Sequence, residues 1–265
     1  MRNVMNAVIA AMILVCGTAA AQSLGQIAVF HEKVGWIGQD AANAAADEIL
    51  SNTTSTDIMA VNLDESASFL ADSTGDGDVD VFFTFGYLPE TVYAPGNAEP
   101  DDSIIEKYIE DGNLYLNTAD YIFYVTLGGG ANEVGGLQNV TDSAFDMWTD
   151  GNNVAPTADG SKYLPSLEGF QSNRSFRKEQ VEADENWDYA VVFAEGPLGE
   201  DPAIIQHADY MGMVGIVMQV ANDNLPRGAV VTELFNNWLP DAFPTTSVDP
   251  IGKSASLWGS LKSAE

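Results

Sequence analysis

Residues 79–130 constrain the fold of this chain more than any other stretch. Residues 79–85 form a run that is apolar on both faces, as in a parallel strand covered by helices on two sides. Apolar residues at helical spacing follow at 104–109, and residues 114–116 form a second short apolar run. A buried strand, an amphipathic helix and another strand in this order predict an α/β protein with a parallel sheet.

The rest of the chain extends this alternation of strands and helices. Apolar, branched or aromatic runs predict further strands at residues 26–30, 57–63, 189–196 and 213–220. Helices are expected at residues 40–50, 65–71, 230–239 and through Ile204 and Ile205. We therefore expect an α/β fold with a mostly parallel, doubly wound sheet in a single domain spanning residues 22–265. Residues 128–184 are rich in Gly, Asn and Ser, with one helix expected at 142–148, and we interpret them as an irregular insertion.

The first 21 residues have the pattern of a secretory signal peptide. Arg2 precedes an apolar run at residues 7–15, and small residues end the segment, so we expect cleavage after Ala21 and a secreted or periplasmic mature protein. An uncleaved N-terminal anchor is the alternative, because the apolar run is borderline in length. The single cysteine, Cys16, would leave with the signal peptide, so the mature chain would have neither a disulfide nor a thiol nucleophile.

The charge balance restricts the partners of this chain. It carries 39 acidic and 10 basic residues, a formal net charge of −29. Loss of Arg2 with the signal peptide would leave 9 basic residues against 39 acidic ones, a net charge of −30. Such a surface repels nucleic acid and anionic membranes. We therefore expect a small polar ligand as the partner, with no nucleic acid and no membrane after cleavage, and the sequence leaves the oligomeric state open.

One acidic stretch suggests a structural calcium loop, the only cofactor that the sequence suggests. Alternate positions carry oxygen-bearing side chains, as in an EF-hand-like loop: Asp72, Thr74, Asp76, Asp78 and Asp80. The twelfth position is Phe83, where calcium loops need a carboxylate. Asp and Gly are also ordinary turn residues, so a plain turn is the alternative interpretation.

Polar and aromatic side chains follow the ends of several predicted strands. His31 and Glu32 close the first strand, and the fifth strand ends at Glu195. The remaining candidates lie in the loop after the third strand or directly after the fourth strand: Tyr87, Tyr93, Asn97, Asn117 and Asp120. Open α/β sheets bind ligands at the carboxyl ends of their strands, so we expect a ligand site there.

Three segments resemble the class I glutamine amidotransferase-like superfamily, in particular its trehalose-utilisation (ThuA-like) branch. They are VDVFFTFG at 79–86, IIEKYIEDGNLYLN at 104–117 and VVTELFNNWL at 230–239. The resemblance implies a flavodoxin-like three-layer fold and a site near Asn117. Catalytic members carry G-x-C-x-G at the nucleophile elbow, where this chain has Asn117, Thr118, Ala119 and Asp120. Glutamine hydrolysis through a thioester is therefore excluded. Because an elbow precedes a helix, the resemblance favours a helix at 118–127, although the composition of that run favours a strand.

These observations leave three functional hypotheses open. The first is a secreted, non-thiol amidotransferase-like domain that binds a small polar ligand, with carbohydrate as the leading class, because aromatic and amide groups suit sugar faces and hydroxyls. The second is a metal-assisted hydrolase or isomerase that uses His31, Glu32, Asp120 and Glu195. The third is a cell-envelope interaction module. The sequence assigns no catalytic residue and does not decide whether the protein is an enzyme.

Overall fold

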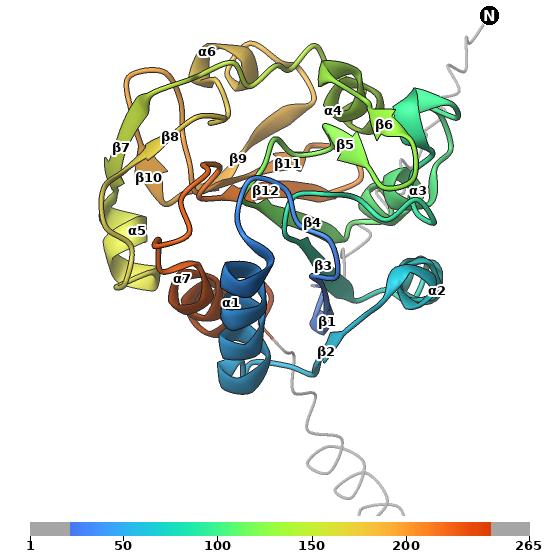
Figure 1. Ribbon diagram of the computed structural model, residues 1–265, viewed down its shortest axis with the longest axis horizontal. Coiled ribbons are helices and arrows are strands. Elements are labelled where there is room, and N and C mark those ends of the chain that lie inside the picture. The colour runs from blue at the N-terminus through green and yellow to red at the C-terminus, as the bar shows by residue number, and fades with distance from the viewer. Residues whose placement is uncertain (1–21, 245–265) are drawn as a thin grey trace, which may run out of the picture.

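A seven-stranded sheet forms the centre of the molecule (Figure 1). The computed structural model describes residues 22–244, so the predicted signal peptide lies outside the described residues. The strands, in their order across the sheet, are β2 (Ile58–Ala60), β1 (Leu24–Phe30), β3 (Val79–Thr84), β4 (Leu114–Thr118), β12 (Met213–Val217), β11 (Ala203–His207) and β9 (Trp187–Val192). Within the described part of the chain, no helix is both long and apolar enough to cross a membrane.

The first five strands across the sheet run parallel to one another. Strand β1 pairs in parallel with β2 and β3, and β4 pairs in parallel with β3 and β12. Strand β11 pairs antiparallel with β12, and β9 pairs antiparallel with β11 at the edge of the sheet. The prediction of an α/β protein with a mostly parallel sheet is therefore confirmed. The carboxyl ends of β1, β3, β4 and β12 consequently meet at one edge, where a ligand site is expected.

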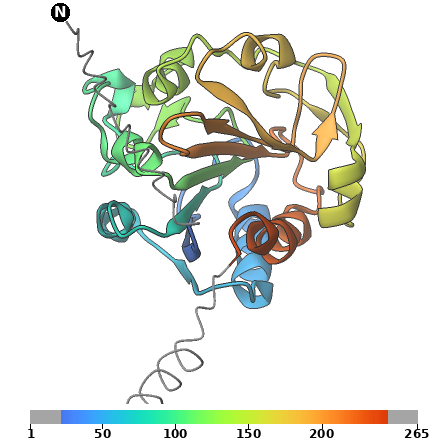
Figure 2. The same ribbon diagram turned by 180° about the vertical axis from the view of Figure 1, so that it is seen from behind.

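Helices cover both faces of the sheet because the strands are apolar on both faces. In β1, Ile27 and Val29 pack in one core cluster while Ala28 and Phe30 pack in the other, as the alternation of strand side chains requires. The first cluster includes apolar residues of α1 (Gln39–Asn52), α7 (Arg227–Glu233) and the π-helical turn η2 (Leu234–Trp238), which α8 (Leu239–Ala242) continues. The second cluster includes residues of α2 (Leu63–Ser73), α3 (Ile104–Glu110) and α4 (Val134–Thr141). Figure 2 shows α1 and α7 side by side, away from α2.

Local sequence signals fix where two of these helices begin. Asn62 accepts hydrogen bonds from the backbone of Asp64 and Glu65, and the Glu65 carboxylate accepts one from the Asn62 backbone. Ser103 and Glu106 form the same reciprocal capping box at the start of α3. Each box satisfies N–H groups that the first turn of a helix leaves unpaired and contributes on the order of 1 kcal/mol.

Residues 128–184, interpreted from the sequence as an irregular insertion, contain several short regular elements. Strands β7 (Asn152–Pro156) and β8 (Phe170–Ser172) join β10 (Ala194–Glu195) in a three-stranded sheet of order β10-β7-β8. A two-stranded ribbon of β5 (Val125–Thr126) and β6 (Gly130–Ala131) lies at its start. The insertion also contains the short helices α5 (Ala158–Tyr163) and α6 (Lys178–Val181), whereas η1 (Pro95–Asn97) lies in the loop after β3.

Three predicted helices are wrong. Residues 118–127 contain turns and no helix. Ala119 takes a left-handed conformation with φ of 70°, and the apolar residues after it pack in the second core cluster. Residues 142–148 are irregular, since Asp142 has φ of 47° and ends α4. Ile204 and Ile205 belong to β11, which pairs on both sides within the sheet. A short apolar run between two strands carries no periodicity that separates helix from strand.

Candidate functional site

An aromatic-walled cavity of about 270 Å³ lies where the loops after the parallel strands meet the insertion. Its rings are those of Trp36, Tyr87, Tyr121, Tyr124 and Trp148. The charged side chains that line it are Asp120 and Arg174, and Val125 completes the lining. A concave site with apolar walls and a few converging polar groups is the usual form of a small-molecule site.

The ends of three parallel strands bring the inner wall of this cavity together. Trp36 follows β1, and its backbone N–H donates to the carbonyl of Ala119 at 2.9 Å. The neighbouring Gly35 N–H donates to the carbonyl of Phe85, directly after β3, also at 2.9 Å. The loop after β1 is therefore tied to the ends of β3 and β4. Asp120 lies two residues after the end of β4, next to Ala119, so these hydrogen bonds at the sheet edge determine its position.

Asp120 is the most buried charged group of the cavity, with 3% of its surface exposed. Its Oδ1 accepts a hydrogen bond from the Tyr121 N–H at 2.6 Å. Its carboxylate packs so closely on Gly35 that a Cβ atom there would overlap it. Burial raises the pKa of Asp120 to about 7, although the Tyr121 N–H and the Arg174 charge act in the opposite direction. A carboxyl group that titrates near neutral pH can donate or accept a proton under physiological conditions.

Asn117 lies inside the turn that carries Asp120 and does not line the cavity. Its side chain is fully buried, and its Oδ1 accepts hydrogen bonds from Thr84 Oγ1 and from the Gly86 N–H, each at 2.9 Å. Its Nδ2 donates to the carbonyl of Asp120 at 2.9 Å. The amide expected to contact a ligand is thus used within the protein. Asn117 is a positioning residue for Asp120.

Replacement of Asn117 with alanine is expected to lower the free energy of unfolding by about 2 kcal/mol, because the buried Gly86 N–H loses its acceptor. Chemical denaturation of the two proteins measures this difference. Asn43→Ala, on α1, serves as the control, because the partners of that side chain are exposed or half-buried. An unchanged stability of Asn117→Ala, with weaker ligand binding, would instead restore the direct-contact hypothesis.

Arg174 reaches the cavity from the insertion and lies among its rings. The centre of its guanidinium group is 4.6 Å from the ring centroid of Trp148, 5.3 Å from Trp36 and 5.8 Å from Tyr121. Its Nη1 donates to Asp150 Oδ1 at 2.6 Å. Cations over aromatic faces are attracted by the ring quadrupole, so these contacts hold the guanidinium in place.

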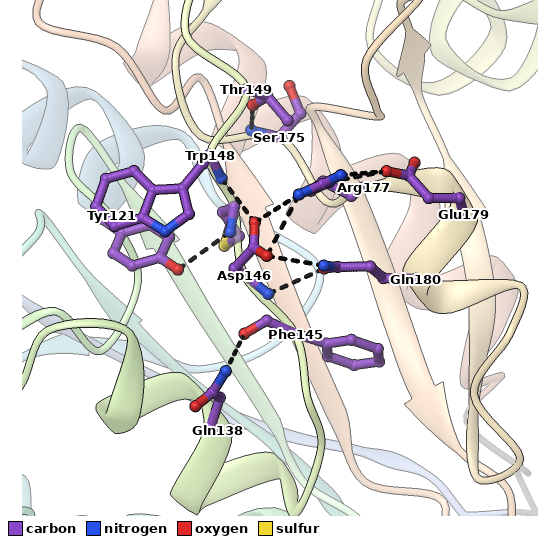
Figure 3. Close-up of polar contacts among 11 residues, drawn as sticks. Tyr121, Gln138, Phe145, Asp146, Trp148, Thr149, Ser175, Arg177, Glu179 and Gln180 are labelled. Carbon is purple, nitrogen blue, oxygen red and sulfur yellow. Dashed lines mark hydrogen bonds and ion pairs between the residues drawn. The ribbon is translucent and has the colours of Figure 1, made fainter.

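Trp148 forms the outer wall, and a polar network fixes the segment that carries it (Figure 3). Asp146 Oδ1 accepts from the Trp148 N–H at 3.2 Å and from Arg177 Nη1 at 3.0 Å, while its Oδ2 accepts from Gln180 Nε2 at 2.9 Å. Partial burial raises the pKa of Asp146, but the hydrogen bonds from Gln180 and Arg177 outweigh burial and hold that pKa below its usual value. Asp146 is therefore charged at neutral pH. The Trp148 ring stacks on Tyr121 with centroids 5.5 Å apart.

The structure brings two of the residues expected at the site into this cavity, Tyr87 and Asp120. Tyr93 is buried, and its hydroxyl donates to Asn97 Oδ1 at 2.8 Å, in a separate polar cluster under the loop after β3. His31 Nδ1 lies 3.2 Å from Asn43 Oδ1. The last two residues lie elsewhere: Glu32 is exposed, and Glu195 lines a different pocket beside Glu200.

Sequence reasoning missed six lining residues of the cavity: Trp36, Tyr121, Tyr124, Val125, Trp148 and Arg174. Trp36 and Tyr121 follow the ends of β1 and β4, so the rule that selected Asp120 could have selected them. Trp148 and Arg174 lie in the insertion and carried no such signal. Their position depends on contacts between distant segments, such as the bonds of Asp146 to residues 177 and 180.

The acidic groups of the described residues form one cluster with metal-ligand spacing, made by Glu106, Glu110 and Asp142. The carboxylates of the predicted calcium loop are not such a cluster. Among the loop residues, Asp72 is exposed on α2, Asp78 accepts a hydrogen bond from Ser23, and Asp80 is buried against the Gln26 N–H. Calcium binding there stays a prediction. The four residues of the metal-assisted hypothesis are not gathered in a cluster either.

Comparison with known proteins gives distant likenesses only. No known family and no curated protein matches the sequence. The structure is similar to that of a ThuA-like protein from Bacteroides uniformis, with a TM-score of 0.42 and 12% identity over 82% of this chain and 91% of the other. It is also similar to a β-galactosidase from Rahnella sp. R3, with a TM-score of 0.40 and 12% identity over 80% of this chain and 31% of the other. Neither likeness assigns this chain to a family.

Proposed function

We propose that this chain is a secreted, non-thiol domain of the glutamine amidotransferase-like type that binds a small carbohydrate in the aromatic-walled cavity. The cavity itself is the observation that carries the proposal. A flavodoxin-like three-layer arrangement is part of it, supported by the parallel strand order β2-β1-β3-β4-β12 and by core clusters on both faces of the sheet. Secretion rests on the signal-peptide pattern of residues 1–21.

The chemistry of the cavity walls suits a sugar ring. Tyr121 and Trp148 offer stacked aromatic faces, against which the C–H face of a pyranose can pack. Asp120, Arg174 and the Tyr87 hydroxyl supply acceptors and donors for ring hydroxyls. A volume of about 270 Å³ lies at the small end of ligand sites and fits one sugar ring better than a long oligosaccharide.

The same lining argues for binding rather than for hydrolysis by a pair of carboxylates. Glycosidases of the common type place two carboxyl groups across the scissile bond. Among the residues that line this cavity, Asp120 alone carries a carboxyl group. A single carboxyl with a pKa near neutrality can exchange protons with a bound hydroxyl or carbonyl but lacks the second group for displacement. Ligand binding is therefore the function that the geometry supports best.

Replacement of Trp148 with alanine is expected to weaken saccharide binding about tenfold, because it removes the outer aromatic wall. Saturation-transfer NMR with a panel of common monosaccharides identifies a ligand, and calorimetry then compares the two proteins. Leu198→Ala is the matched control, since the Leu198 and Trp148 residues are each 48% exposed and Leu198 lies outside the cavity lining. If no saccharide binds the wild-type protein, or if Trp148→Ala binds as well as wild type, the proposal is wrong.

A further inference from the structure

The guanidinium group of Arg174 lies among aromatic rings, and one of its edges has no acceptor among residues 22–244. The ring centroids of Trp148, Trp36 and Tyr121 lie within 5.8 Å of its centre, so cation–π contacts hold the group among these rings. The N–H bonds of a guanidinium group lie in its own plane, so further hydrogen-bond partners bind in that plane. In-plane hydrogen bonding is the mode in which arginine recognises planar anions.

In the described part of the chain, no acceptor pairs with the edge of Arg174 formed by Nε and Nη2. Nη1 donates to Asp150 Oδ1 and to the carbonyl of Asn173. Nε is buried and has no hydrogen-bond partner within residues 22–244, and Nη2 likewise donates to no residue in that range. Native proteins rarely leave a buried donor unsatisfied, and an acceptor supplied by a ligand would remove its cost. A carboxylate fits this edge because its two oxygens match the spacing of the two donors.

We infer that the ligand of this cavity is an acidic sugar, a pyranose whose carboxylate binds the Nε–Nη2 edge of Arg174 while its ring packs on Trp148. The inference rests on the proposed function and names its ligand class. The Asp120 carboxyl faces the same cavity and, when protonated, donates a hydrogen bond to the anion or to a ring hydroxyl. A chain with a net charge of −29 repels anions in general, so selective binding of one requires a local cation of this kind.

Matched pairs of sugars test this inference by calorimetry on the chain from residue 22 onward. D-glucuronate is compared with D-glucose, and D-galacturonate with D-galactose, at fixed ionic strength. In at least one pair the acid is expected to bind roughly ten to a hundred times more tightly than the neutral sugar, as a charge-assisted bidentate contact provides. Arg174→Gln should abolish the preference, and Arg174→Lys should keep only part of it, because lysine retains the charge without the planar fork.

Two further variants separate recognition from folding. Asp150→Asn removes the competing carboxylate and keeps the guanidinium, so the preference for the acid should persist or increase. Lys107→Gln removes one exposed positive charge on α3, outside the cavity lining, and should leave both affinities unchanged. If Arg174→Gln fails to fold, as circular dichroism would show, Arg174→Lys and Asp150→Asn still decide the question.

The possible failures are distinguishable. Equal affinities for the acid and the neutral sugar, in wild type and in Arg174→Lys, would overturn the acidic-sugar inference and leave carbohydrate binding intact. A preference that Lys107→Gln reduces as much as Arg174→Lys would show a general charge effect and would also overturn it. Absence of binding by all four sugars would overturn the proposed function itself.

Discussion

Replacement of Asp201 with alanine is expected to lower the free energy of unfolding by about 3–5 kcal/mol, the usual cost of breaking a buried charge network. Asp201 is completely buried and lies two residues before the start of β11 in the sequence. Its Oδ1 accepts from the Met218 N–H at 2.7 Å, and its Oδ2 accepts from the Gln219 N–H at 2.8 Å and from Ser172 Oγ at 2.6 Å. Alanine leaves these donors without an acceptor, and the nearby buried Arg227 loses a balancing charge.

The effect of this substitution extends to the cavity, because the same network supports the turn that carries Asp120. Gln219 Nε2 donates to the carbonyl of Asn117 at 2.9 Å, and Arg227 Nε donates to Thr118 Oγ1 at 3.1 Å. Asp201→Ala is therefore expected to weaken ligand binding as well as folding.

Urea denaturation at pH 8 measures the stability of Asp201→Ala. Burial raises the pKa of Asp201 to about 6, despite the hydrogen bonds that it accepts, so the carboxylate is charged at pH 8. Asp209→Ala is the control, because that residue is exposed, and its stability should stay within about 0.5 kcal/mol of wild type. A loss below 1 kcal/mol for Asp201→Ala would mean that the carboxylate does not hold these segments together.

Replacement of Asp120 with asparagine is expected to remove part of the pH dependence of folding stability. The folded protein holds the Asp120 proton up to a pKa of about 7, whereas the unfolded chain releases it near the ordinary aspartate pKa of 3.8. Between these values the folded state binds more protons, so this group's contribution to stability falls as pH rises, by roughly 1.4 kcal/mol per pH unit. The contribution is complete below pH 4 and is lost above pH 7. The asparagine side chain does not titrate. The free energy of unfolding of Asp120→Asn, relative to that of wild type, should therefore rise by about 2–4 kcal/mol between pH 4 and pH 8.

Denaturation curves of wild type and Asp120→Asn at several pH values in this range give the measurement. Asp80 and Asp201 also have pKa values raised to about 6 by burial, so the wild-type curve alone mixes several groups. The difference between the two proteins isolates Asp120, because both contain the other two carboxyls. Parallel curves would contradict the raised pKa and with it the proton-exchange role of this residue.

The sequence predicts the inner parallel strands β3 and β4 well because they are covered on both faces. The run at 79–85 carries apolar residues on both faces, and β3 occupies Val79–Thr84 with every residue buried. The errors occur where local signals and packing disagree. The glycines after residue 127 resemble a helix cap, but the left-handed Ala119 and the buried rings after it produce a turn. Ile204 and Ile205 are strand residues because β12 and β9 pair on either side of them.

The candidate site could be located from the sequence but not completed. Asp120 and Tyr87 were accessible to prediction, because residues that follow parallel strands reach the same edge of the sheet. Asn117 was also predicted as a ligand residue, but its amide faces Thr84 and Gly86 inside the turn. Side-chain direction at a turn depends on which backbone groups need partners, and the sequence alone does not reveal them.

One wall of the cavity comes from the edge of the central sheet, and the other comes from the insertion. Asp120 and the glycines around it belong to the sheet edge, where a change disturbs the packing of neighbouring strands. Trp148 and Arg174 belong to the insertion, and neither takes part in the pairing of the parallel strands. Ligand preference on this scaffold can therefore evolve, or be engineered, separately from foldability. Libraries that randomise positions 148 and 174 while holding 35, 86 and 120 constant should yield folded proteins with altered sugar selectivity.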